Sequence, residues 1–230
     1  SGTLATIANV LANLGVNIEN IEQRNKPDAK TFIDSDVIKY LKENFISLKI
    51  DADTNYGSKL FQKYKGTGYP LLLFLDSNKN EIERFYGFYE AKDFLEKLTN
   101  IRNGKNTFPA ILKNYELGDH SVETLSQLAV KYAERGDDSL ATFFYNQTLQ
   151  SKNLPIKLFY EAKYYLTSKE LKFQNSEPLE QYLSEYPDSP FLTDALNQLL
   201  GYFKINKLAE KEIEYFNTYI DKLSDDPWFL

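Results

Sequence analysis

Apolar residues recur along this chain in two different patterns, and the pattern changes near residue 102. Before that point, alternating and continuous apolar runs lie between segments with helical periodicity. After it, apolar residues recur almost everywhere at intervals of three and four positions, which is the spacing of an amphipathic helix. The pattern therefore predicts an α/β first part and an all-α second part.

The first part should contain both helices and strands. Asp34 or Ser35 is a suitable N-cap for a helix that ends near Asn44. Phe45–Ile50 alternates apolar and polar residues, which predicts a half-buried strand. Leu71–Leu75 is apolar at every position, which predicts an inner strand covered on both faces. Four further elements are expected: helices over 3–14, 58–64 and 90–101, and a strand over 81–86 after the turn-rich segment 76–80.

The polar segment 102–107 contains a glycine and two asparagines and predicts a boundary between two domains, at 1–101 and 108–230. In the second domain, one stretch has the spacing of a tetratricopeptide repeat. It consists of Leu128, Ala129, Tyr132, Gly136, Ala141, Tyr145 and Thr148. Later copies are degenerate, apart from a Tyr-Pro-x-Ser-Pro junction at 186–190. An ordinary helical bundle is the alternative, since stacked helical hairpins obey the same packing rules.

Four segments of the first domain resemble a thioredoxin-like domain, and the resemblance extends from Asp28 to Ile101. The segments are 30–41, 45–51, 68–75 and 87–89, followed by the amphipathic stretch 90–101. The resemblance implies an α/β sheet-and-helix fold followed by the tetratricopeptide-like domain. It also implies a cis peptide bond before Pro70, in a loop where Gly68, Tyr69 and Pro70 contact an extended polypeptide substrate by β-augmentation.

The family's redox motif is absent from this sequence. A strand and a Trp-Cys-x-x-Cys motif normally come just before the first similar segment, whereas here Pro27 leads directly into Asp28, and the chain has no cysteine and no methionine. Either the full-length protein carries a further segment between Pro27 and Asp28, or the sheet has been rebuilt without it. We favour the first hypothesis, because loss of a central strand would leave unpaired backbone groups on both sides of the gap.

These observations give two hypotheses for function. The resemblance implies thiol–disulfide exchange on protein substrates, by cysteines that no position of this chain supplies, so the catalytic residues stay unknown. The alternative is a redox-inactive adaptor that binds peptides or partner proteins, with the helical domain as a docking surface. We expect an extracytoplasmic or periplasmic location by family analogy, with a cytoplasmic one left open.

The amino-acid composition argues against several other classes of function. The net charge of −6 and the pI near 5.0 argue against a nucleic-acid-binding surface, and no apolar run is long enough to span a membrane. His120 is the only histidine and lies in a polar connection, so we expect a solvated side chain there. With one histidine and no cysteine, we expect no metal site and no cofactor.

Overall fold

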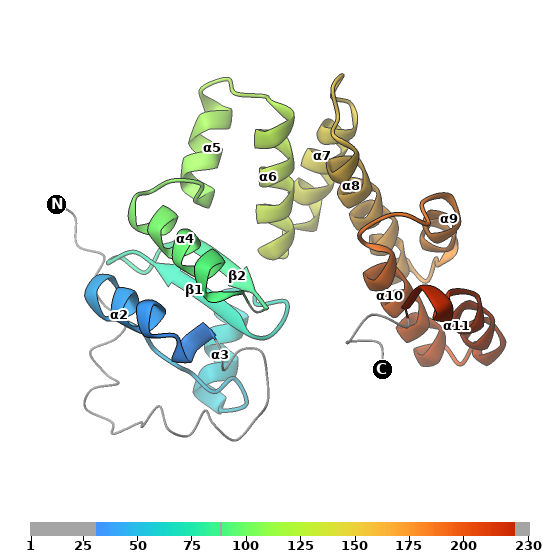
Figure 1. Cartoon of the computed structure of the whole chain (residues 1–230), viewed down its shortest axis with the longest axis horizontal. Coiled ribbons are helices and arrows are strands. Elements are labelled where there is room, and N and C mark those ends of the chain that lie inside the picture. Colours follow the sequence, from blue (N-terminus) through green and yellow to red (C-terminus); the bar gives the residue numbers. More distant parts are fainter. Residues whose placement is uncertain (1–30, 88, 224–230) are drawn as a thin grey trace. The chain divides into compact units, whose positions relative to one another are not determined.

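The structure is a computed structural model that describes residues 31–87 and 89–223 (Figure 1). Within these ranges the protein is mostly helical, with one small two-stranded sheet. The expected helix over 3–14 and the join between Pro27 and Asp28 lie outside the described residues. Among these residues the second part is helical, as the sequence predicted, whereas a thioredoxin-like fold for the first part stays a prediction.

The described chain forms its helices and strands in a simple order. The first part contains α2 (Ser35–Asn44), α3 (Asn55–Lys63), β1 (Leu71–Leu75), β2 (Glu81–Tyr86) and α4 (Ala91–Arg102). The second contains α5 (Phe108–Glu116), α6 (Val122–Glu134), α7 (Asp138–Leu149), α8 (Ile156–Lys169), the short 3₁₀ helix η2 (Glu170–Phe173), α9 (Glu177–Glu185), α10 (Leu192–Ile205) and α11 (Ala209–Leu223).

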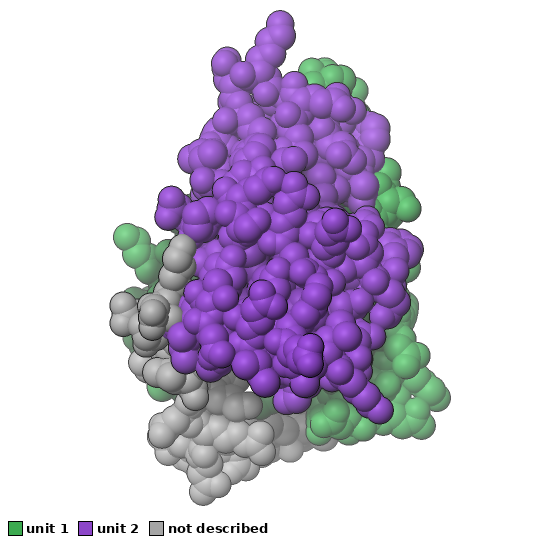
Figure 2. Space-filling model, turned by 90° about the vertical axis from the view of Figure 1, so that its right-hand side faces the viewer, with its two compact units in different colours: residues 1–120, 130–141 green, residues 121–129, 142–230 purple. Residues whose placement is uncertain are grey.

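Two compact units can be distinguished, and Figure 2 colours them separately. The first comprises residues 1–120 and 130–141, and the second comprises residues 121–129 and 142–230. The division falls within α6 and α7. It describes compactness alone, so the domain limits at 1–101 and 108–230 stay a prediction.

The helix α2 begins where the sequence predicted. The Asp34 carboxylate accepts hydrogen bonds from the backbone N–H groups of Asp36 and Val37, both at 3.0 Å. These groups have no partner inside the helix, so an N-cap carboxylate stabilises the first turn. Val37 on the opposite side of this turn is fully buried.

The two strands form an antiparallel hairpin whose turn is built by Asp76. One oxygen of its carboxylate accepts hydrogen bonds from the backbone N–H groups of Asn78 and Asn80, both at 2.8 Å. Leu71 pairs with Tyr86 at the open end, and the register shifts between Phe74 and Leu75. The structure therefore contains strands over 71–75 and 81–86, with the predicted turn between them.

The core of the first unit lies between the hairpin and the two helices α2 and α4. It consists of the buried residues Val37, Phe85, Phe94, Leu98 and Ile101. Aromatic rings meet edge to face around it, with Phe74 and Phe85 at 5.6 Å between ring centroids. Such contacts add to the burial of apolar area, which dominates the stability of a small unit.

Two strand predictions are wrong for the described residues. Phe45–Ile50 forms no strand, and Leu48 and Ile50 keep 37% and 36% of their surface exposed. Leu71–Leu75 was expected as an inner strand, but within 31–87 and 89–223 it pairs only with β2. A strand is stable only when its N–H and C=O groups find a partner, and no described strand lies between these two segments. This observation counts against a complete thioredoxin-like sheet.

The second unit has a core of its own, formed mainly by α9, α10 and α11. It consists of Leu179, Tyr182, Leu183, Leu192, Ala195, Leu196, Leu199, Phe203 and Tyr219. The buried Tyr182 hydroxyl donates to the Tyr160 carbonyl at 3.2 Å and lies 2.5 Å from the Ser189 hydroxyl. The serine of the Tyr-Pro-x-Ser-Pro junction therefore satisfies a buried polar group.

The predicted helical pair is present. α6 and α7 are separated by a turn in which Gly136 has a φ of +68°, a conformation that favours glycine. Leu128, Ala129, Ala141 and Tyr145 are all buried, as the spacing requires. Assignment of this pair to a tetratricopeptide repeat stays a prediction.

Candidate functional site

The loop that leads into β1 carries the three residues singled out in the sequence. The peptide bond between Tyr69 and Pro70 is cis, as expected. The Tyr69 side chain is 67% exposed, and its ring stacks on that of Phe61 in α3 at a centroid distance of 4.5 Å. The structure therefore presents an aromatic side chain to solvent directly before the apolar strand.

At Gly66 the loop has no room for a side chain, a requirement that the sequence did not reveal. A Cβ atom at Gly68 would meet only the Tyr86 ring, at an ordinary 3.6 Å. A Cβ at Gly66 would lie 2.3 Å from the ring of Phe61, closer than real atoms approach. Gly66 thus lets the Phe61 ring lie against the backbone, and Phe61 in turn supports Tyr69.

The outer edge of β1 has no strand partner among the described residues. All five residues of β1 are half-buried, and the hydrogen-bond ladder runs along β2 alone. Such an edge presents a row of N–H and C=O groups to any chain that comes alongside in an extended conformation. Tyr69 and Pro70 lie at the start of this edge.

Two side chains on β2, those of Tyr86 and Arg84, form hydrogen bonds with the backbone of the segment that leads to Tyr69. The Thr67 N–H donates to the Tyr86 hydroxyl at 3.1 Å. The Arg84 guanidinium donates to the carbonyl oxygens of Tyr64 at 2.8 Å and Lys65 at 3.3 Å. Neither residue was singled out in the sequence, because charged and hydroxyl side chains on a strand usually face solvent.

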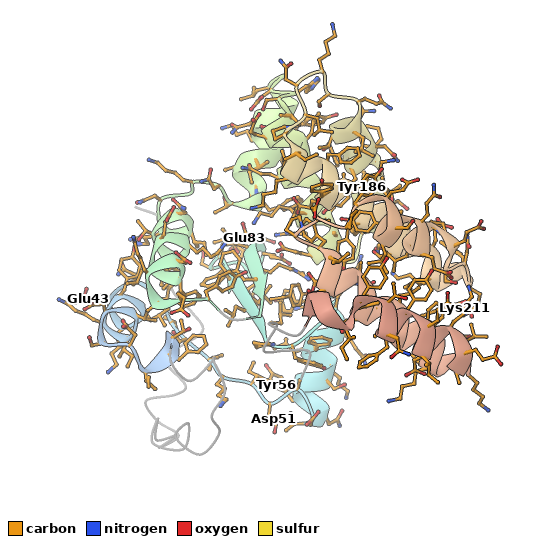
Figure 3. The ribbon with its side chains drawn as sticks, turned by 45° about the vertical axis from the view of Figure 1, so that its right-hand side comes forward. Glu43, Asp51, Tyr56, Glu83, Tyr186 and Lys211 are labelled. Atoms are coloured by element: carbon orange, nitrogen blue, oxygen red, sulfur yellow. The ribbon has the colours of Figure 1, made fainter. Side chains whose placement is uncertain are left out.

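Arg84 belongs to a buried cluster of opposite charges that joins β2 to the end of α6 (Figure 3 labels Glu83). Glu83 is only 1% exposed and accepts from the Lys131 ammonium at 2.6 Å. The Arg135 guanidinium lies 2.7 Å from the Glu81 carboxylate and 3.5 Å from that of Glu83. Each buried charge is therefore compensated by a close partner of opposite sign, which burial demands.

Glu134 is the exception in this cluster. One oxygen of its carboxylate is buried without a hydrogen-bond partner, and among the described residues the same holds for Nη2 of Arg135, which nevertheless lies within ion-pair distance of Glu81. Burial raises the pKa of Glu134 to about 7, and the negative charge of Glu83 raises it further, whereas Lys131, Arg135 and Lys97 oppose the shift. The carboxyl group therefore changes charge close to neutral pH.

We expect Glu134→Gln to stabilise the protein at pH 8 by about 1–3 kcal/mol and to have little effect at pH 5. The folded state holds the Glu134 proton more tightly than the unfolded chain, so stability falls as the pH rises from 4.5 towards 7. Glutamine removes this loss, because it stays neutral. Urea unfolding at both pH values measures the difference, with the exposed Glu96→Gln as control. A larger gain at pH 5 than at pH 8 would contradict the assignment.

Metal and histidine chemistry find no support in the described part of the chain. Residues 31–87 and 89–223 contain no group of three or more His, Cys, Asp or Glu side chains placed to hold a metal ion. His120 is exposed, and its ring lies 4.7 Å from that of Tyr115. The candidate functional site is therefore the loop at Tyr69 and Pro70 together with the outer edge of β1.

Comparisons with known proteins leave this geometry as the basis for inferring function. No protein-family model, no curated protein and no solved structure matches the chain. Among the described residues, none of the helices has the length and apolar character needed to cross a membrane.

Proposed function

We propose that the protein is a thioredoxin-like protein that binds an extended polypeptide along the outer edge of β1, beside Tyr69 and Pro70. In this proposal the full-length protein carries out thiol–disulfide exchange on that polypeptide. The cysteine pair lies on a further segment between Pro27 and Asp28, which this chain lacks. The observation that carries the proposal is that β1 pairs with β2 alone in the part of the chain that the structure describes.

The order of elements supports the proposal. A helix, the segment 45–50, a second helix, a loop, an antiparallel hairpin and a last helix follow each other as the resemblance implies. In that family a central strand lies between the counterparts of 45–50 and β1. Among the described residues, β1 pairs with β2 alone and 45–50 belongs to no strand, so one additional strand between them would supply backbone partners to both.

The chemistry of exchange follows from the proposed segment. A thiolate at a helix N-terminus attacks a substrate disulfide, forming a mixed disulfide and releasing one substrate thiol. The second cysteine attacks the mixed disulfide and releases the other thiol, leaving the protein oxidised and the substrate reduced. The residues of this chain contribute the binding step, in which Tyr69 and the β1 edge hold the substrate in an extended form.

A redox-inactive adaptor is the second candidate, and the composition favours it. The 230 residues contain no cysteine, so the chain as it stands can bind but cannot exchange disulfides. In this case a partner's strand occupies the β1 edge, and the helical part supplies a further docking surface. An extracytoplasmic location fits the enzyme better than the adaptor, since substrate disulfides persist in oxidising compartments.

The intact mass of the protein from its natural source, measured with its activity on a small disulfide, separates the two candidates. A mass well above 26.7 kDa together with disulfide reduction supports the enzyme. A mass equal to that value without reduction supports the adaptor. A larger mass without reduction would contradict the proposed exchange.

Polypeptide binding itself is tested with Tyr69→Ala. We expect affinity for a fluorescein-labelled, carboxymethylated insulin B chain to fall about tenfold, because an aromatic contact contributes about 1.4 kcal/mol. Tyr56→Ala is the matched control, since Tyr56 in α3 is 69% exposed and Tyr69 is 67% exposed (Figure 3). Equal losses in the two variants, or no loss in either, would show that the polypeptide binds elsewhere.

A further inference from the structure

The Tyr86 hydroxyl joins three segments that are distant in the sequence. It accepts from the Thr67 N–H at 3.1 Å and from the Arg84 guanidinium at 3.2 Å. It donates to the carbonyl oxygen of Glu134, the last residue of α6, at 3.0 Å. A phenolic hydroxyl has one proton and two acceptor sites, so every hydrogen bond that it can make is made.

Arg84 connects the same segments through backbone carbonyl groups. Besides Tyr64 and Lys65 at the end of α3, its guanidinium donates to the Glu134 carbonyl at 3.1 Å. The last carbonyl groups of a helix lack partners inside the helix and carry partial negative charge. One buried cation therefore binds backbone carbonyl groups at the C-terminal ends of two helices, α3 and α6.

The turn after α6 lies against the loop as well. A Cβ atom built on Gly136 would lie 3.4 Å from the Thr67 methyl group. The segment from Lys65 to Tyr69 thus has β2 on one side and the turn at Gly136 on another, while Lys65, Thr67 and Tyr69 themselves are exposed.

We propose that Tyr86 and Arg84 are positioning residues for polypeptide binding, because they fix the loop 65–69 to the end of α6. The proposal rests on the proposed binding of an extended polypeptide at β1. Strand addition requires the loop backbone to continue the line of the β1 edge. A loop that is free must be ordered when the polypeptide binds, and ordering weakens binding. The end of α6, in the helical part of the sequence, thereby becomes part of the binding site's support.

Tyr86→Phe tests the proposal, because it removes the hydroxyl and keeps the ring. We expect the Thr67 amide to exchange with solvent at least tenfold faster, and affinity for the labelled insulin B chain to fall about tenfold. Exchange at the amides that pair β1 with β2 should stay unchanged. Tyr40→Phe is the control, since it removes a hydroxyl from the same unit on α2, and we expect no change in probe binding.

A second variant changes the turn after α6, which contacts the loop. Gly136→Ala adds a methyl group against Thr67 at a residue whose φ is +68°, so it should displace the turn and also weaken probe binding. Combined with Tyr86→Phe, its effect should be less than additive, because both variants release the same loop. Additive losses would overturn the proposal.

The remaining outcomes are distinguishable. If Tyr69→Ala weakens probe binding and Tyr86→Phe does not, the loop binds the polypeptide without needing this support, and the positioning role is wrong. If Tyr86→Phe accelerates exchange throughout β1 and β2, Tyr86 has a general structural role and the proposal is again wrong. If Tyr69→Ala has no effect on binding, the proposed function itself fails.

Discussion

Arg84→Ala should destabilise the first unit by about 3–5 kcal/mol, the largest effect expected of any charge removal in this protein. The guanidinium is buried, and its loss deprives the carbonyl oxygens of Tyr64, Lys65 and Glu134 of a donor. It also removes one of the two guanidinium groups that form ion pairs with the Glu81 carboxylate, the other being that of Arg135. Buried groups that lose a charged partner pay their full desolvation cost.

Equilibrium unfolding in urea measures this loss. Arg102→Ala is the matched control, because Arg102 is exposed in the last turn of α4, and we expect a change within 0.5 kcal/mol. An Arg84→Ala variant destabilised by less than 1 kcal/mol would mean that water replaces the guanidinium without cost. The ion pairs of the buried cluster would then contribute no more to stability than ion pairs on a protein surface do.

Phe203→Ala should destabilise the second unit by about 3–5 kcal/mol. Phe203 is fully buried in α10, and its ring meets that of Tyr215 at 5.4 Å. The ammonium of Lys211, which Figure 3 labels, lies 5.5 Å from the centre of this ring. Removal of the ring leaves a cavity between α10 and α11 in addition to the lost burial of apolar area. Neighbouring side chains relax only partly into such a space.

Hydrogen exchange resolved by segment is the suitable measurement for Phe203→Ala. Protection should fall in α9, α10 and α11, whose residues share the core of the second unit. Phe173→Ala serves as control, because Phe173 is 75% exposed and should change stability by less than 0.5 kcal/mol. Equal loss of protection in the two variants would show that the cluster around Phe203 is not the stabilising core.

Local sequence rules predicted the elements that depend on neighbouring residues. The Asp34 cap needs only the N–H groups two and three positions ahead, and the turn at Asp76 needs only those of the next four residues. The helical periodicity that buries Phe94, Leu98 and Ile101 likewise lies within one segment. Such features form in the structure because no distant part of the chain competes with them.

Elements that need distant partners were predicted less well. Phe45–Ile50 has the alternation of a strand, but alternation supplies no partner for its backbone, and no described strand pairs with it. Similarly, Leu71–Leu75 is apolar throughout, yet sequence alone could not show that one of its edges lacks a neighbour. Propensity describes a surface that fits a sheet, and tertiary contacts decide whether the sheet forms.

The residues of the candidate site were likewise predictable only in part. Tyr69 and Pro70 could be named from the resemblance, whereas Arg84 and Tyr86 could not. Both bind the carbonyl oxygen of Glu134 at the end of α6, which lies 50 positions from Arg84 and 48 from Tyr86, and nothing in the local sequence of β2 indicates this partner. A signal did exist: Glu-x-Glu-Arg within an otherwise apolar strand is unusual, since buried charges occur with partners.

The edge of β1 that pairs with no strand among residues 31–87 and 89–223 also has a consequence for behaviour in solution. A run of five apolar residues with a free sheet edge would be a template on which a second copy adds its own strand, and repeated addition leads to fibrils. Natural sheets protect such edges with lysine, proline or a covering segment. Pro70, which has no backbone N–H, limits strand addition at one end of β1, but no charged residue interrupts Leu71–Leu75. Whatever chain occupies this edge therefore acts as a shield against self-association, and protein with an empty edge should aggregate sooner as its concentration rises.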